Sequence, residues 1–305
     1  MIKDHKLFIP TILLLIGGTA YGSVISANKL AVDSGFPFIA YAFWQMLIAS
    51  AVLCAFCVLF RCPPRMGIRY FRVYALTATF GLSGPLLILT FLADKLPPSV
   101  LTLMVALIAP AVYLLALLVR AEKFRWLSVL GVALGFVGVV LIIIPEHSLP
   151  DPSMAIWVLF ALLLPASAAI NNVYTAKLMP SEVNSLSLTA GLMMITTFIL
   201  FIIMLLSDGL VVVTNVGMNG VWPTLWAAAG NALTYVCFFE IIRRAGPIFF
   251  AQLNYVVVAA GVVWAYLLFG ETPTVWLWGA IAVIAIGLAV MNFAKAASLR
   301  QSKHL

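Results

Sequence analysis

Apolar runs of about twenty residues follow one another along almost the whole chain, and only short polar loops separate them. No soluble domain could bury so much apolar surface, because the chain is 64% hydrophobic and only 9% charged, whereas soluble domains are about 25% charged. A bilayer accommodates such runs as helices that satisfy their own backbone hydrogen bonds. The sequence therefore predicts an all-α, multi-pass membrane protein without a separate soluble domain.

Charges and Pro/Gly breaks divide the apolar runs into ten expected transmembrane helices. The expected spans are residues 7–29, 36–60, 70–92, 98–119, 125–144, 153–177, 183–206, 221–242, 247–269 and 274–294. Pro85, Pro110 and Pro165 fall inside spans, and each removes a backbone donor, so we expect local helix breaks there. The first span continues past Tyr21 without a clear cleavage site, so we expect an uncleaved helix rather than a signal peptide.

Lysine and arginine residues divide very unequally between the two sides of the predicted helices. With the N-terminus inside, 15 of the 17 basic residues lie on the inner side, and only Lys29 and Lys95 lie outside. This is the positive-inside pattern of short loops, and it predicts a protein of the cell inner (plasma) membrane with both termini cytoplasmic. The same pattern explains the net charge of +7 without a nucleic-acid partner.

The chain also matches itself when it is shifted by 149 residues. The matched pairs are Gly81 with Gly230, Pro98 with Pro247, Glu122 with Glu271, and Gly138 with Gly287, while Lys29 meets Lys177 at a shift of 148. We expect two units, residues 1–148 and 149–305, with five helices each. An odd number of helices per unit gives the two units opposite orientations, so the fold class expected is ten transmembrane helices arranged as two inverted five-helix repeats.

Two stretches resemble the EamA-type branch of the drug/metabolite transporter superfamily. They are residues 107–143 (LIAPAVYLLALLVRAEKFRWLSVLGVALGFVGVVLII) and residues 256–291 (VVVAAGVVWAYLLFGETPTVWLWGAIAVIAIGLAVM). Each looks like the family's helix, acidic turn and Gly-containing helix, although the first unit has Arg120-Ala121-Glu122 where the second has the family's Gly270-Glu271 turn. The resemblance implies that helices 1, 3, 4, 6, 8 and 9 surround a central cavity, and it does not define the substrate.

Polar and aromatic side chains inside these spans are candidates for lining that cavity, because polar groups in hydrocarbon need partners or water. Asn231 and Tyr235 share one helical face at i and i+4. Interhelical hydrogen bonding is the alternative role for such groups. The candidate substrate-binding residues are Tyr21, Asn28, Trp44, Tyr113, Asn171, Asn172, Asn231, Tyr235, Phe239, Gln252 and Tyr255.

Three charged residues near span ends are candidates for gating or coupling. Lys29 and Lys177 occupy matched positions in the two units, and the alternative is that they reach opposite interfaces with their long side chains. Glu240 lies about one turn inside helix 8, where Arg243 and Arg244 at i+3 and i+4 could neutralise it instead.

Charge is absent from the middle of every predicted span. A central charge costs about 2.5 to 3.5 kcal/mol on insertion scales, so its absence favours a neutral or zwitterionic substrate and disfavours a carboxylate proton relay. No catalytic constellation, metal cluster or cofactor motif is evident, so we expect no enzyme, no metal and no cofactor.

The sequence thus predicts a secondary transporter of a small neutral or zwitterionic metabolite, an amino acid or related compound, with export favoured and alternating access as the mechanism. The alternative is an uptake carrier for a quaternary amine or another small organic cation, which the many aromatic residues could hold by cation–π attraction. A membrane-embedded lipid-modifying enzyme and a channel are weaker alternatives. Membrane lipid and a small-molecule substrate are the expected partners, while a coupling ion and the choice of monomer or homodimer stay open.

Overall fold

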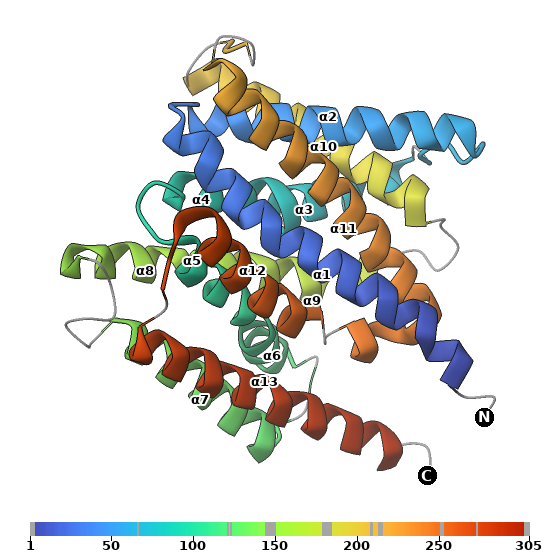
Figure 1. Ribbon diagram of the computed structural model, residues 1–305. Helices are drawn as coiled ribbons and strands as arrows, with labels where there is room; N and C mark the ends of the chain where they lie inside the picture. Colours follow the sequence, from blue (N-terminus) through green and yellow to red (C-terminus); the bar gives the residue numbers. More distant parts are fainter. Residues whose placement is uncertain are drawn as a thin grey trace.

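The computed structural model describes residues 4–65, 67–120, 122, 124–143, 151–178, 185–207, 210–212, 216–250, 253–272 and 274–301. These residues form helices and short connections (Figure 1). In the first half of the chain the elements are α1 (Asp4–Asp33), α2 (Phe38–Leu59), α3 (Ile68–Thr77), the π-helix η1 (Ala78–Ser83), α4 (Gly84–Leu92), α5 (Pro98–Ala106), α6 (Ile108–Leu118) and α7 (Trp126–Ile143). In the second half they are the 3₁₀ turn η2 (Pro152–Met154), α8 (Ala155–Ala161), α9 (Leu163–Leu178), α10 (Ser185–Ser207), α11 (Met218–Phe250), α12 (Leu253–Phe269) and α13 (Val275–Gln301).

These elements assemble into ten membrane spans. Six described segments are by themselves long and apolar enough to cross a membrane, among them the composite spans α3-η1-α4, α5-α6 and α8-α9. The shorter apolar helices α7, α12 and α13 and the 33-residue α11 supply the other four. The expected all-α, ten-helix membrane fold is therefore confirmed.

Pro85, Pro110 and Pro165 each lie next to a helix irregularity, whereas Pro10 lies within the continuous helix α1. Pro85 follows η1, in which the amide of Gly84 bonds back to the carbonyl of Thr79 in the wide π pattern. Pro110 lies three residues after a turn at Leu107, and Pro165 lies three residues after a turn at Leu162. The missing proline donor explains why the regular hydrogen-bond ladder fails at these places, as the sequence predicted.

The packing of the helices repeats between the two halves of the chain. α2 packs on α10 at one edge of the bundle and α7 packs on α13 at the other (Figure 1). α1 packs on α11 and α12, and in the other half α9 packs on η1, α4 and α6. Because each contact has its counterpart between equivalent helices, the two five-helix repeats surround a common centre. The division at residues 148 and 149 stays a prediction.

The contact between α7 and α13 uses a glycine pair that the internal repeat predicts. A Cβ added to Gly138 would lie 2.4 Å from the Ile284 side chain, and a Cβ added to Gly287 would lie 2.8 Å from the carbonyl oxygen of Gly131. Small residues allow membrane helices to approach closely where no hydrophobic effect drives them together. The matched glycines therefore hold the fifth helices of both repeats in contact.

The boundary between the eighth and ninth spans differs from the expected one. The sequence predicts a break at residues 243–246 before a helix beginning at Pro247, whereas α11 continues to Phe250. Arg243 and Arg244 suggest a loop in the sequence, but Arg244 forms an ion pair with Glu240 one turn earlier on the same helix. An i,i+4 pair of this kind is compatible with continued helix, so charge alone did not mark the end of the span.

Candidate functional site

The irregular turn in the third span supplies two backbone carbonyls to neighbouring helices. Pro85 lacks the amide that would bond the carbonyl of Gly81, and this oxygen instead accepts a 3.4 Å hydrogen bond from the Tyr235 hydroxyl of α11. The adjacent Phe80 carbonyl accepts a 2.9 Å bond from the Ser167 hydroxyl of α9. The π-turn therefore joins the first repeat to two helices of the second repeat. π-turns are frequent at functional sites.

Buried amides form a second link between the repeats. The Asn231 side-chain amide on α11 donates to the Gln45 side-chain oxygen on α2 at 3.1 Å and to the Ala227 carbonyl at 3.0 Å. On α1, the Asn28 side-chain oxygen accepts a 2.9 Å bond from the Tyr41 hydroxyl. Asn28, Gln45 and Tyr41 are each no more than 1% exposed, so these polar groups lie fully inside the bundle.

A small internal cavity lies between α1, α2, α11 and the η1-α4 segment. Its polar lining comes from Tyr21 and Asn28 of the first repeat and from Asn231 and Tyr235 of the second, and its remaining lining residues are apolar or glycine. None of the lining residues carries a formal charge at neutral pH. The volume is about 20 Å³, which is room for about one water molecule. This conformation therefore encloses the centre of the molecule without leaving space for a metabolite.

A larger hollow of about 410 Å³ lies along α1 beside Trp264 of α12. Leu15 and Ile16 line it and are 52% and 43% exposed, so it opens on the surface of the molecule. Its position outside the helices and its mostly apolar lining make it a poor place to hold a polar metabolite. We therefore place the candidate site in the internal cavity.

The structure brings several of the predicted binding residues together. Tyr21, Asn28, Asn231 and Tyr235 line the cavity. Asn171 lies beside them, because a Cβ added to the cavity residue Gly81 would lie 2.7 Å from the Asn171 side chain. Glycine at position 81 thus allows the amide of α9 to lie directly against η1.

Other predicted binding residues lie away from the cavity. The Trp44 indole donates at 2.7 Å to the Val211 carbonyl, and the Tyr113 hydroxyl accepts at 2.9 Å from the Arg125 amide at the start of α7. Asn172 is exposed and donates at 2.8 Å to the Ala168 carbonyl on its own helix. Tyr255 packs against a hydrophobic core cluster. These side chains serve local packing and helix connections in this structure.

The structure does not describe the side chains of three predicted site residues. Gln252 lies outside the described residues, and so do the side chains of Phe239 and Lys177.

Gln45 is a site residue that sequence reasoning missed. The family resemblance directed attention to helices 1, 3, 4, 6, 8 and 9, and Gln45 lies on the second helix. A signal was nevertheless present, because Gln45 is the only amide side chain in a span of 22 otherwise mostly apolar residues. An amide at such a position needs a buried partner.

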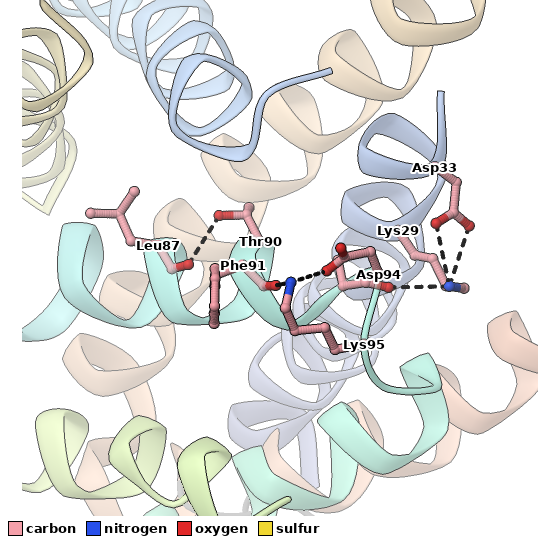
Figure 2. Close-up of polar contacts among 8 residues, drawn as sticks. Lys29, Asp33, Leu87, Thr90, Phe91, Asp94 and Lys95 are labelled. Carbon is pink, nitrogen blue, oxygen red and sulfur yellow. Dashed lines mark hydrogen bonds and ion pairs between the residues drawn. The ribbon is translucent and has the colours of Figure 1, made fainter. Parts of the chain in front are cut away.

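A polar network closes one end of the bundle. The Lys29 ammonium group on α1 donates to the Ala93 carbonyl at the end of α4 at 3.1 Å and pairs with Asp33 at 3.3 Å (Figure 2). At the same end, the Glu271 carboxylate after α12 accepts a 3.3 Å bond from the amide of Ser99 in the first turn of α5. A carboxylate at a helix N-terminus is stabilised by the helix dipole. This network, which we call the end latch, joins α1 to α4 and α12 to α5.

The Trp44 and Tyr113 contacts lead to a test that separates structural from ligand-binding residues. We expect Trp44→Phe and Tyr113→Phe each to lower the free energy of unfolding by about 1 kcal/mol. Trp44→Phe removes one hydrogen bond to the backbone, and Tyr113→Phe removes one short and one long hydrogen bond to the Arg125 backbone. Thermal unfolding with and without a bound ligand measures this, and the ligand-induced shift should equal that of the wild type. If a variant lost the ligand-induced shift in melting temperature, the substituted residue would contribute to ligand binding.

Comparisons with known proteins agree with this architecture. The model of the EamA-like transporter family matches residues 9–144 and 155–293. No curated protein matches the chain significantly in sequence. A solved structure titled "Crystal structure of protein" superposes with a TM-score of 0.61 over 94% of this chain and 99% of its own, at 20% sequence identity, a likeness that shows the fold alone. With two family matches that together span nearly all ten helices, the chain belongs to the EamA-like transporter family.

Proposed function

We propose that this membrane transporter is a secondary carrier that moves a small neutral or zwitterionic metabolite, an amino acid or a related compound, by alternating access. The proposed location is the cell inner (plasma) membrane, with both termini cytoplasmic and export as the direction. Family membership supports transport of small molecules in general. The finer statements rest on the cavity and on the distribution of charge.

The observation that carries the proposal is a polar but uncharged cavity to which both repeats contribute. Asn28 comes from the first repeat and Asn231 from the second, and both are at most 3% exposed. A fully charged substrate would need a buried partner charge, and the cavity lining offers none. A neutral or zwitterionic substrate needs hydrogen bonds only, which amides and phenols supply.

The repeat architecture supports alternating access. Two similar units of opposite topology can exchange conformations and so open a central site to each side in turn. The end latch closes one end in this structure through Lys29 and Glu271. If the basic residues mark the cytoplasmic side, the closed end is the outer one. Lys29 is then proposed as an outer gate, with Lys177 as its inner counterpart and with Glu240, paired with Arg244, near the inner interface.

Counterflow by the purified protein in liposomes tests this proposal. A thermal-shift screen of amino acids, amines and sugar nucleotides first selects a ligand, since a compound that binds the folded carrier raises its melting temperature. Without ATP, liposomes preloaded with that compound should accumulate the labelled compound transiently, and the initial rate should saturate with concentration.

The same assay distinguishes the competing functions. A linear, non-saturating flux with measurable conductance would contradict the carrier and indicate a channel. Saturable counterflow of a quaternary amine such as choline, with none of any amino acid, would contradict the zwitterionic substrate and favour the cation carrier. Efflux from preloaded cells then tests the direction of export.

A further inference from the structure

Two amide donors beside the cavity have no hydrogen-bond partner among the described residues. They are the Nδ2 group of Asn28 and the Nε2 group of Gln45, and both are fully buried. Most buried polar groups in proteins are hydrogen-bonded, so an unsatisfied group in a native structure needs an explanation. In a membrane protein the surrounding lipid cannot supply a partner.

The arrangement of bonds fixes which atoms are left over. Asn231 donates through Nδ2 to the Ala227 carbonyl, which can only accept, so the atom of Gln45 that faces the same nitrogen is the oxygen. The nitrogen of Gln45 is therefore the group without a partner. The Tyr41 hydroxyl donates to the oxygen of Asn28 on α1, and the nitrogen of Asn28 has no partner among the described residues.

One donor lies in the cavity lining, and the other lies on a residue next to it. Asn28 lines the cavity directly. Gln45 precedes the lining residue Met46 and is bonded to the lining residue Asn231. The unpaired atoms of these two amides are therefore N–H donors, which select a group that accepts hydrogen bonds.

We propose that Asn28 and Gln45 together bind the carboxylate of a zwitterionic ligand. This inference rests on the proposed function and specifies which end of the ligand the amides hold. Hydrogen bonds from amides to a carboxylate are stronger than those to a neutral acceptor. Because the described lining residues include no cation, the ammonium group of the ligand itself balances the carboxylate charge. A simple amine presents no acceptor to these donors, so we expect it to bind more weakly than the amino acid.

The cavity must expand before it holds such a ligand, because its present volume of about 20 Å³ accommodates only one water molecule. In the closed conformation a water can therefore satisfy the Asn28 donor, and the ligand carboxylate reaches both donors when the helices separate. Beside the cavity, the third span is irregular at η1 and Pro85. Helices bend most readily at such places.

Matched ligand pairs test the inference on the unmodified protein. Phenylalanine and phenethylamine, and leucine and isoamylamine, differ only by the carboxylate. We expect the amino acid of at least one pair to raise the melting temperature of the purified protein, with a dissociation constant at least about tenfold below that of its amine, because tenfold corresponds to one lost charge-assisted hydrogen bond. Equal binding of amine and amino acid overturns the inference and leaves the carrier intact.

Asn28→Asp and Gln45→Glu are the matching variants. Each keeps the oxygen that Tyr41 or Asn231 uses and replaces the free donor by a carboxylate oxygen of nearly the same size. We expect each variant to bind the amino acid at least about tenfold more weakly than the wild type does. The ratio of the dissociation constants of the amine and the amino acid should therefore decrease or fall below one. The control is Asn172→Asp, the same change at an exposed amide away from the cavity, which should bind like the wild type.

The outcomes separate the inference from the proposed function. Unchanged amino-acid binding in both folded variants overturns the inference. The two amides would then bind only a water or form hydrogen bonds between helices. Counterflow of an amino acid that survives in these variants still supports the carrier. Failure of the wild-type protein to bind or carry any tested compound contradicts the proposed function and with it the inference. The wild-type ligand pairs decide the inference even if a variant does not fold.

Discussion

Asn231→Leu should reduce carrier-mediated counterflow at least tenfold while leaving a folded protein. The side chain lines the cavity and donates to Gln45 across the boundary between α11 and α2. Leucine fills nearly the same space but leaves the Gln45 oxygen without a donor, and a buried polar group that loses its partner costs about 1–3 kcal/mol. Counterflow in liposomes and size-exclusion chromatography of the same preparation measure the two expectations.

The control for this variant is Asn172→Leu. Asn172 has the same side chain, but it is exposed and bonds only to the Ala168 carbonyl of its own helix. Its counterflow should remain within about twofold of the wild type, because only a weak local bond is lost. Wild-type counterflow by Asn231→Leu, or equal losses in both variants, would contradict a binding site at the cavity.

Gly22→Ala should strongly destabilise the folded protein. A Cβ at this position would lie 2.8 Å from the backbone nitrogen of Gly261 on α12 and 3.1 Å from the Val257 carbonyl. Backbone atoms cannot rotate away as a side chain can, so α1 and α12 would have to separate. Overpacking of this kind costs about 1–3 kcal/mol, and thermal unfolding in detergent measures it.

Gly279→Ala is the matched control on α13, because the nearest atom to an added Cβ is a Leu141 methyl carbon at 4.0 Å. It should unfold at the wild-type temperature or slightly above, since alanine favours helix over glycine. Equal melting temperatures for Gly22→Ala and the wild type would show that α1 and α12 do not approach as closely as described.

Much of the fold could be predicted from the sequence because the membrane imposes simple rules. The length and composition of the apolar runs predicted the spans. Gly138 and Gly287, which the internal repeat matches, both lie at the contact between α7 and α13. The breaks near Pro85, Pro110 and Pro165 followed from the missing proline donor. The π form of the turn before Pro85 did not follow, because the partners of its carbonyls come from α9 and α11, far away in the sequence.

The candidate site was only partly predictable. Asn28, Asn231 and Tyr235 were found because polar groups inside spans are rare and face the interior. Trp44 and Tyr113 meet the same criterion but satisfy backbone groups elsewhere. Position along a span does not give the direction in which a side chain points when the neighbouring helices are unknown. Gln45 was missed because its role depends on Asn231, which is 186 residues away.

Accessibility of the cavity from each side of the membrane tests the central claim most directly. Met46 lines the cavity and is fully buried, so Met46→Cys, in a variant whose native cysteines are replaced, reports on opening. Cysteines at Glu122 and Glu271 mark the two sides of the membrane. We predict that a membrane-impermeant maleimide labels position 46 from either side, and that positions 122 and 271 react from opposite sides only. Labelling of position 46 from one side or from neither, or of positions 122 and 271 from the same side, would contradict a central cavity that two inverted repeats open alternately.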